Sequence, residues 1–558
     1  MWRRFLPSLK PSRIFPILIV CVVAAFALGL TVGDSDYFFK INKSIDIFGR
    51  VYKEITLNYV DEVDPEKFMR SGVEGMLDEL DPYTTFIGEK EGDDIELLTT
   101  GKYGGIGVTI GLRDGYITVT SLMEGYAAQR QGILTGDRII EVEGKSMIGV
   151  KPDQVRSLTR GEPGAVVHLR IEREGEPGPL EFSLVREEIV LKNVSYADFV
   201  DDGIAYVKMD RFSRGAGDEL RVAVKELKLR GEIKGMILDL RENPGGLLDA
   251  AVEVVDKFVP RGSLVVSTRG RKPESERKYF AQEEPLLPDE PLVVLVNRNS
   301  ASASEIVAGA IQDMDRGVVL GTRTFGKGLV QTVAPLVYNT ELKITTAKYY
   351  TPSGRSIQEI DYMHKGGDGV FKVTPDSLRR EFRTARGRKV FELGGIAPDS
   401  VLELPEASTL HQELMHKSMY FKFATNYAAQ HREGRPNSES DTGMFAEFKR
   451  FLEEKLFTYQ EKGEVKLKEL REIADKSKYS TAMMMEIERL SEQMKEEKEK
   501  AYERNKAEIL RVLKAEIAAR YEGEKGRIRT LLPDDMQVQA AVGLVKTSKS
   551  YEKILAGK

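Results

Sequence analysis

Hydrophobic and polar positions follow several different patterns along the 558 residues of the chain. Residues 35–98 repeat apolar side chains at helical spacing, which predicts amphipathic helices. From Tyr103 to about Glu187 the apolar positions gather in short β-rich runs, interrupted by helical stretches near 127–131 and 152–158. Because about 85 residues in this order suit one small module, we expect a separate β-rich domain here.

A third pattern, from about 190 to 405, alternates buried strands with helices and predicts an α/β core. A strand over 235–240 is followed by the turn Asn243-Pro244-Gly245-Gly246 and by a helix over 247–259. The apolar run at 292–296, with a helical pattern after it, repeats this plan. We therefore expect two strand–turn–helix units of the same kind in the core.

Beyond about 406 the chain is charged and helix-forming, with an apolar stripe along 487–519. The stripe consists of Ile487, Leu490, Met494, Ile509, Val512, Leu513 and Ile517. Such a stripe is more often a packing face than a dedicated partner site. Oligomerisation, cover for a substrate channel and docking of an adaptor protein remain open as roles for this region.

The N-terminus has the pattern of a targeting segment. Four basic residues precede an uncharged stretch from Ile14 to Gly33, and they are Arg3, Arg4, Lys10 and Arg13. The stretch is nearly long enough to span a bilayer, and its basic flank is expected to stay in the cytoplasm. We expect an exported, periplasmic or extracytoplasmic protein anchored in the inner (plasma) membrane, with a cleaved signal peptide ending near Gly33 as the alternative.

Charge and composition narrow the function. A net charge of −5 and a pI near 5.9 give no reason to expect a nucleic-acid partner. The single cysteine, Cys21, excludes an intrachain disulfide, and the five histidines show no zinc-ligand spacing. We therefore expect chemistry without a metal or another cofactor.

One segment looks built to hold a reactive serine: Ser300-Ala301-Ser302-Ala303-Ser304-Glu305-Ile306, between the strand at 292–296 and a helix. A buried strand, a tight turn and a helix present a hydroxyl at a helix N-terminus, where backbone N–H groups stabilise negative charge. A serine nucleophile also needs a base. The nearest histidine along the chain, His364, lies in a polar, glycine-rich stretch that we expect to be an exposed loop.

Lysine is the next candidate for the base, because burial lowers its pKa. Lys327 follows the serine turn and is flanked by Gly326 and Gly328, which let the backbone approach another element closely. Gln331 lies four residues on, so it shares a face with Lys327 on a regular strand or helix. From spacing alone, Gly-Lys-Gly is more often a solvated loop.

Several motifs together resemble the C-terminal processing peptidases, serine–lysine proteases with an embedded PDZ domain. They are the serine motif, Gly326-Lys327-Gly328 with Gln331, the turn at 241–246, Tyr350-Thr351-Pro352-Ser353-Gly354-Arg355-Ser356-Ile357-Gln358 and Gly394-Gly395-Ile396-Ala397-Pro398-Asp399. The resemblance covers roughly residues 40–405. It implies a multidomain α/β protein with a core of crotonase-like topology.

The resemblance also implies roles for individual residues. Ser302 is similar to the family's nucleophile, Lys327 to its general base and Gln331 to the residue that orients the base. Ser300 and Ser304 are then structural. The oxyanion hole combines the backbone N–H of Ala303 with one from the turn at 243–246, where Gly245 and Gly246 are both candidates.

The β-rich module resembles a PDZ domain, which binds the C-termini of protein or peptide substrates. The segment Tyr103-Gly104-Gly105-Ile106-Gly107 is similar to the loop that caps a peptide's carboxylate, so Gly104, Gly105, Ile106 and Gly107 are the predicted peptide-binding residues. Residues 132–140 match the family's turn and strand. The specificity pocket is expected between the strand after Gly107 and a helix within 151–159.

These inferences divide the chain into five regions. They are a targeting segment (1–34), a helical region (35–99), a PDZ domain (100–188), a protease core (189–405, with 35–99 contributing) and a helical C-terminal extension (406–558). The predicted function is an exported serine endopeptidase that uses Ser–Lys acyl-enzyme chemistry. The alternative is a non-catalytic PDZ scaffold or adaptor in the cell envelope.

Overall fold

The computed structural model describes residues 36–557 except 90–95, 98, 366–370, 374, 376, 378 and 432–439. The chain divides into two units, Met1–Phe86 and Ile87–Lys558, which are described separately. Within the described ranges, no helix has both the length and the apolar character needed to cross a membrane. The predicted targeting segment, residues 1–34, lies outside the described residues.

The first unit contains a helix over residues 36–58 and α2 (Pro65–Leu77). Asp64 caps α2 by accepting hydrogen bonds from the N–H groups of Glu66 and Lys67, and Pro65 takes the first helical position. Helices were predicted as far as residue 98, but a short strand, β1 (Thr85–Ile87), already follows α2. Residues 96, 97, 99 and 100 are helical again, so the strand interrupts the predicted helical region and does not end it.

The second unit begins with the β-rich module. Its sheet is antiparallel and follows the order β3-β4-β5-β7-β8, with β6 on β5. These strands are β3 (Val108–Arg113), β4 (Tyr116–Leu122), β5 (Arg138–Val142), β6 (Lys145–Ser146), β7 (Val166–Glu172) and β8 (Leu180–Val185). Two short helices, α4 (Ala127–Arg130) and α5 (Pro152–Thr159), lie where they were predicted. A ribbon of β2 (Lys102–Gly105) and β9 (Glu187–Val190) joins the module to the rest of the unit.

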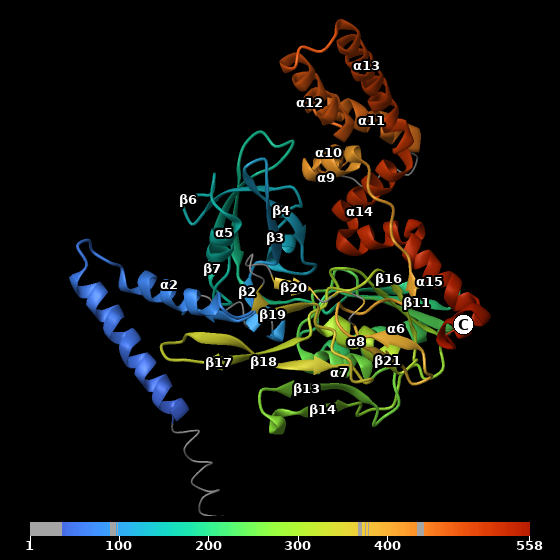
Figure 1. Ribbon diagram of the computed structural model, residues 1–558. Coiled ribbons are helices and arrows are strands. Elements are labelled where there is room, and N and C mark those ends of the chain that lie inside the picture. Colours follow the sequence, from blue (N-terminus) through green and yellow to red (C-terminus); the bar gives the residue numbers. More distant parts are fainter. Residues whose placement is uncertain are drawn as a thin grey trace, which may run out of the picture. The chain divides into compact units, whose positions relative to one another are not determined.

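The α/β core is built on a six-stranded sheet, β10-β11-β12-β15-β16-β23, of which β11 and β16 are labelled in Figure 1. Its strands are β10 (Val194–Asp201), β11 (Ile204–Met209), β12 (Gly235–Asp239), β15 (Leu292–Val296), β16 (Val318–Gly321) and β23 (Ser400–Val401). All pairs are parallel except that of β10 with β11. The two predicted strands at 235–240 and 292–296 are therefore neighbours in the same sheet.

One face of this sheet is covered by α6 (Ala216–Arg230), α7 (Leu248–Val255) and α8 (Ala303–Asp313). Alternate strand residues, such as Leu238 and Val294, point into this helical layer. Helix α7 ends four residues before its predicted end. Beyond Val255 the N–H groups of Lys257 and Phe258 donate three residues back, to the carbonyls of Val254 and Val255, so the chain continues in tighter turns.

The other face is covered by helices from the far end of the chain, α15 (Met536–Lys546) and α16 (Ser548–Leu555). Val293 and Leu295, which alternate with the residues of the first face, pack with Val538 and Val542. The last part of the predicted extension therefore belongs to the α/β core. Every residue of β12, β15 and β16 is buried, as expected for a parallel sheet with both faces covered.

A second sheet of the core contains β17 (Leu329–Pro335), β18 (Glu341–Tyr350), β13 (Leu264–Gly270) and β14 (Arg277–Phe280). Strand β18 pairs with both β17 and β13. Two small hairpins follow, β19 (Ile360–Lys365) with β20 (Phe371–Val373) and β21 (Glu381–Arg383) with β22 (Lys389–Phe391). His364 therefore lies in a strand and not in the predicted loop, because residues 360–365 pair with β20.

Six helices lie among the described residues of the helical region between the core and α15. They are α9 (Thr409–His416), α10 (Met419–Gln430), α11 (Asp441–Glu454), α12 (Lys462–Lys476), α13 (Thr481–Arg504) and α14 (Lys506–Leu531). The predicted stripe at 487–519 falls on two helices that meet at Asn505. Ile509, Leu513 and Ile517 are buried in the core of this region, which confirms a packing face for that half.

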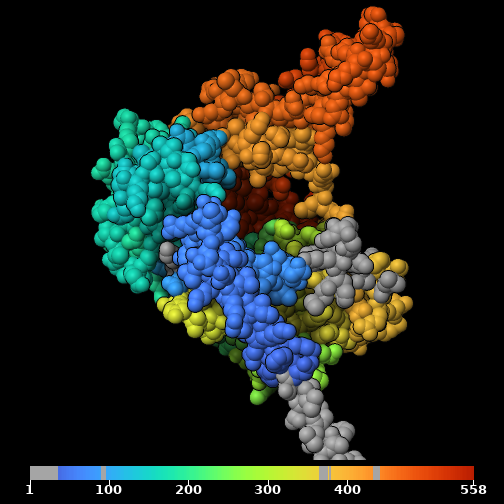
Figure 2. Space-filling view, turned by 60° about the vertical axis from the view of Figure 1, so that its left-hand side comes forward, coloured from blue at the N-terminus to red at the C-terminus, as the bar shows by residue number. Residues whose placement is uncertain are grey.

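The helical region contacts the β-rich module. Lys422 of α10 pairs with Asp114 at 2.8 Å, and Lys525 of α14 pairs with Glu124 at 3.2 Å. In Figure 2 the orange helices adjoin the cyan module. The Lys525 pair is exposed and the Lys422 pair is partly exposed, so both fix orientation more than they add stability.

The C-terminal helices should contribute measurably to the stability of the core. The Tyr551 hydroxyl donates to the Leu292 carbonyl and accepts from the Leu292 N–H, both at 3.0 Å and both buried. We expect Tyr551→Phe to lower the free energy of unfolding of the core by about 1–3 kcal/mol, because it removes the partner of buried backbone groups. Urea unfolding of the purified protein measures this, with Tyr479→Phe, at an exposed tyrosine, as the control. Equal losses in the two variants would contradict the prediction.

Candidate active site

Ser302 lies between the turn that follows β15 and the first residue of α8. Its backbone has φ 54° and ψ −112°, a left-handed conformation that is rare for residues other than glycine. Such strain is typical of a serine held on a sharp strand-to-helix turn. The N–H of Ala303, the first residue of α8, has no acceptor within the helix and is available at the site.

The structure distinguishes Ser302 from its two neighbours. Ser300 and Ser304 are fully buried, and their hydroxyls donate to the carbonyls of Leu240 (2.7 Å) and Asn243 (2.9 Å). Both hydroxyls therefore tie the serine turn to the turn at 241–246. Ser302 is partly exposed, so its side chain can be reached from solvent.

The turn at 241–246 lies directly against the serine turn. The Asn243 carbonyl accepts from the N–H of Ala301 at 3.1 Å. Gly245 has φ +100°, and a Cβ there would lie 2.9 Å from both the Ser302 Cβ and the Ala303 nitrogen. Glycine is therefore required at this contact.

The two glycines of the turn are not equivalent. Gly245 faces Ser302, and its N–H donates to Asn243 Oδ1 at 2.9 Å. Gly246 packs against Phe212, whose carbonyl oxygen would lie 2.2 Å from an added Cβ. The structure thus brings Gly245 next to Ser302 and Ala303, with the Gly245 N–H bonded to Asn243, and leaves the choice of the second oxyanion N–H a prediction.

Glu305 is the central residue that the sequence interpretation did not assign. Its carboxylate is fully buried and accepts four hydrogen bonds. Oε2 accepts from the N–H groups of Ser302 (2.8 Å) and Lys327 (2.9 Å), and Oε1 accepts from Thr324 Oγ1 (2.6 Å) and the Gly326 N–H (2.7 Å). One carboxylate thereby connects the segment that carries the serine to the segment that carries the lysine.

A signal for this role was present in the sequence. Ser302 and Glu305 have the spacing of a capping box, in which an acidic side chain returns to the N–H at the start of its helix. Burial raises the pKa of Glu305 to about 7, although the four hydrogen bonds that its carboxylate accepts lower it. Near neutral pH this carboxyl is therefore close to the midpoint of its titration.

Lys327 lies in a segment whose backbone approaches its neighbours closely, as the flanking glycines predicted. A Cβ on Gly326 would lie 2.6 Å from the Glu359 side chain, and one on Gly328 would lie 2.9 Å from the Gln358 nitrogen. Lys327 itself is partly buried. Its backbone is fixed by Glu305, while its role as a base stays a prediction.

The position of Gln331 relative to Lys327 differs from the prediction that both lie on one regular strand or helix. Lys327 precedes β17, so the two residues do not share one regular strand, and the pairing of β17 with β18 is irregular between Val330 and Gln331. Gln331 Nε2 donates to Thr345 Oγ1 at 3.2 Å. Its proposed contact with the lysine remains a prediction.

The predicted peptide-binding loop lies where β2 leads into β3. Gly104 and Gly105 pair with β9, whereas Ile106 and Gly107 form the connection, with the Ile106 side chain in the module core. Strand β3 is at the end of its sheet, and α5 packs against it. The groove between β3 and α5 is the predicted place for the specificity pocket, and an end strand has backbone groups to offer a peptide.

Among the described residues, no group of three or more His, Cys, Asp or Glu side chains is arranged to hold a metal ion. The groups assembled around Ser302 are a hydroxyl, backbone N–H groups, a buried carboxylate and the lysine segment. Together they suit nucleophilic attack on a carbonyl group, with stabilisation of the resulting oxyanion.

Comparison with known proteins agrees with this chemistry. The model of "Peptidase family S41" matches residues 203–376, that of "PDZ domain" matches 94–172, and that of "Probable PDZ-protease, C-terminal helical domain" matches 410–545. A "Carboxy-terminal-processing protease" of Bartonella bacilliformis is 39% identical over 321 residues, which cover 57% of this chain and 73% of the relative.

Two further proteins are similar to this chain. "Carboxy-terminal processing protease CtpA" of Bacillus subtilis is 31% identical over 64% of this chain and 76% of the relative. The solved structure "Photosystem II D1 C-terminal processing protease" is 26% identical, with a TM-score of 0.35, over 64% of this chain and 92% of that one. The chain belongs to the carboxy-terminal processing proteases, serine peptidases of family S41 that carry a PDZ domain.

Proposed function

We propose that this protein is an exported endopeptidase that cleaves by Ser–Lys acyl-enzyme chemistry. Ser302 Oγ attacks the substrate carbonyl while the Lys327 amine takes the hydroxyl proton. The proton then passes to the leaving amine as the peptide bond breaks, and water hydrolyses the ester by the reverse sequence. Gln331 orients the lysine.

The single observation that carries this proposal is the shared carboxylate oxygen of Glu305. Because the N–H groups of Ser302 and Lys327 both donate to Oε2, the two segments are held at a fixed separation. The Ala303 N–H and an N–H of the Gly245–Gly246 turn stabilise the oxyanion. Positioning of this kind supplies much of an enzyme's rate enhancement.

We propose further that the PDZ domain selects substrates by their free C-termini. A peptide would add as a strand to β3, with its carboxylate at the connection formed by Ile106 and Gly107. The uncharged segment from Ile14 to Gly33, with its basic flank, supports export and anchoring in the plasma membrane. Both features suit a protease that acts outside the cytoplasm on exposed chain ends.

The first prediction concerns the catalytic pair. Ser302→Ala and Lys327→Ala should each lower hydrolysis of an unstructured protein by at least about a thousandfold, because either change removes the activated nucleophile. Circular dichroism should show both variants folded. Lys225→Ala, on the exposed side of α6, is the control and should keep full activity. Normal turnover by either active-site variant would refute the Ser–Lys assignment.

The second prediction concerns Glu305. In the wild type, N–H donors from both segments bond to the Glu305 carboxylate oxygens. Glutamine replaces one of these oxygens with an NH₂ group, which cannot accept, so Glu305→Gln should separate the serine and lysine segments. We expect a loss of about a hundredfold in kcat, the effect of a misplacement of about 1 Å. Glu232→Gln, at an exposed glutamate, should retain activity. A fully active Glu305→Gln protein would contradict the positioning role.

The third prediction is the pH dependence that Glu305 gives to stability. The pKa of Glu305 is about 7 in the folded protein, against an ordinary 4.5. As the pH rises, the unfolded chain therefore loses this proton at a lower pH than the folded protein does. The protonated carboxyl makes its full contribution to the free energy of unfolding below pH 4.5. As the pH rises to 7, about 3 kcal/mol of this contribution is lost. Urea unfolding of wild type and Glu305→Gln across pH 4.5–8 should therefore give a difference that shrinks with rising pH. Parallel curves would contradict it.

The fourth prediction concerns carboxylate recognition. A peptide with a free C-terminus should bind the Ser302→Ala protein at least about tenfold more tightly than its C-terminally amidated form, measured by fluorescence anisotropy. Gly107→Ala should remove this preference, because Gly107 has φ +79° and its Cβ would lie 2.4 Å from the Tyr126 side chain. Gly115→Ala, at φ +80° with open space around it, is the matched control. Equal binding of both peptides would argue against recognition by this loop.

A further inference from the structure

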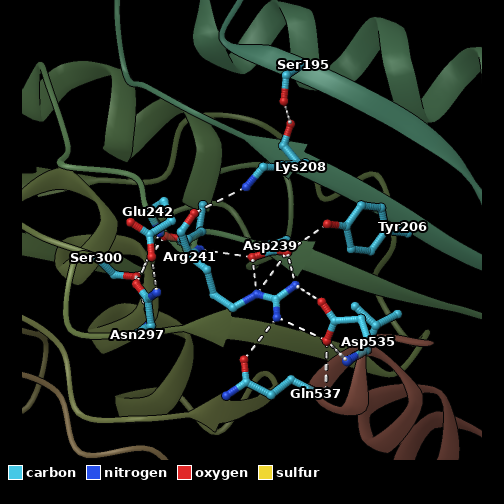
Figure 3. A network of polar contacts seen from close by, with 12 residues as sticks. Ser195, Tyr206, Lys208, Asp239, Arg241, Glu242, Asn297, Ser300, Asp535 and Gln537 are labelled. Carbon is cyan, nitrogen blue, oxygen red and sulfur yellow. Dashed lines mark hydrogen bonds and ion pairs between the residues drawn. The ribbon is translucent and has the colours of Figure 1, made fainter. Parts of the chain in front are cut away.

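A partly buried charge network connects the C-terminal helix α15 to the turn beside Ser302. Arg241, the first residue of that turn, lies between Asp239 at the end of β12 and two side chains from the start of α15 (Figure 3). Its guanidinium donates to Asp239 Oδ1 at 2.9 Å from Nε and to Oδ2 at 2.5 Å from Nη2. On the other side, Nη1 donates to Asp535 Oδ1 at 3.1 Å and to Gln537 Oε1 at 3.0 Å.

Asp535 has two functions in this arrangement. Its Oδ1 caps α15 by accepting from the N–H groups of Gln537 and Val538, both at 3.0 Å. Its Oδ2 lies 2.9 Å from Arg241 Nη2. The start of α15 therefore determines where the Asp535 carboxylate lies, and this carboxylate in turn holds the Arg241 guanidinium in place.

The Arg241 side chain is held on both sides, so it cannot rotate without breaking charged hydrogen bonds. Planar guanidinium groups bound by two carboxylates have a defined orientation, which a lysine would not reproduce. Asp239 is held in turn by the Tyr206 hydroxyl, which donates at 2.7 Å. Burial raises the pKa of Tyr206 well above its ordinary value, so this hydroxyl stays neutral and remains a donor.

The backbone of Arg241 is fixed as well. Its N–H donates to Asp239 Oδ1 at 2.9 Å, and Lys208 Nζ donates to its carbonyl at 3.3 Å. The next residue, Glu242, has φ 63° and accepts from the Asn297 and Asn299 side-chain amides, both at 2.6 Å. The turn is therefore fastened to the serine turn on one side and to α15 on the other.

We propose that Asp535 and Gln537 are positioning residues for the oxyanion hole, acting through Arg241, so that the C-terminal helices of this chain form part of its catalytic apparatus. The inference rests on the proposed function of Ser302 and of the turn at 243–246. The turn must keep its N–H groups aimed at the developing oxyanion, and the α15 side supplies half of its fixation. A shift of α15 would then change the rate of the chemical step without changing the substrate groove.

The test uses the full-length chain with Asp535→Asn and Asp535→Ser. Both substitutes are good N-cap residues, so they retain the cap of α15 while removing the charge that holds Arg241. We expect kcat to fall about tenfold while KM stays within about twofold, because only stabilisation of the transition state is impaired. A peptide aldehyde inhibitor, whose adduct places an oxygen in the oxyanion hole, should bind about tenfold more weakly to both variants.

A double-mutant cycle that combines Asp535→Asn with Arg241→Lys measures the coupling between Asp535 and Arg241. If Asp535 acts through Arg241, Asp535→Asn should have little further effect on kcat in the Arg241→Lys protein. Lys546→Ala is the matched control, because it breaks another ion pair of the same helix, with Asp201 at 2.7 Å, far along α15 from Arg241. It should leave kcat and aldehyde binding unchanged.

Three outcomes would overturn the inference. They are wild-type kcat and aldehyde binding in both Asp535 variants, effects that add fully to that of Arg241→Lys, and failure of both variants to fold while Lys546→Ala folds. Ser302→Ala in the same preparation separates the two proposals. If that variant is inactive and the Asp535 variants are fully active, only the positioning role fails, and if Ser302→Ala is active, the proposed function itself fails.

Discussion

Helices cover both faces of the core sheet along its central strands, and this constraint organises the rest of the second unit. Strands β12 and β15 are buried at every position, with alternate residues packed against α6–α8 on one side and α15–α16 on the other. A parallel sheet of this kind is stable only when both faces are covered. The chain must therefore return to the core after its helical region, and the C-terminal helices are part of the enzyme's fold.

The same sheet positions the chemistry. Parallel strands end at one edge, so the turns after β12 and β15 meet there, and the hydrogen bonds of Ser300 and Ser304 connect them. Glu305 then joins the serine turn to the lysine segment. These contacts use the backbone as donor or acceptor, which explains why the motifs consist of small residues, glycines and a few short polar side chains. Larger side chains would occupy the space in which the two turns touch.

Short-range patterns in the sequence were sufficient to predict much of the fold and the serine turn. The buried strands at 235–240 and 292–296, the serine turn with its helix, and the strands of the β-rich module all carry a strong short-range signal. Tertiary pairings were out of reach. Asp535 lies 294 residues after Arg241, and no periodicity connects them. Glu305 was visible as a capping residue, but its contact with the Lys327 N–H depends on a segment 22 residues away. The regular strand assumed for Lys327 and Gln331 is not found, because Lys327 precedes β17 and the pairing is irregular at Gln331, and their contact stays a prediction.

Covering the second face and fixing the active-site turn are two consequences of one arrangement. Helix α15 packs its apolar side on Val293 and Leu295, and its N-terminus brings Asp535 to Arg241. Because the apolar contacts set where the helix lies, they also set where the carboxylate lies. The helical region α9–α14 precedes α15 directly and contacts the PDZ domain through Lys422 and Lys525. The surface that α15 shares with the sheet therefore contributes to stability and, through Asp535 and Arg241, to the position of the turn beside Ser302.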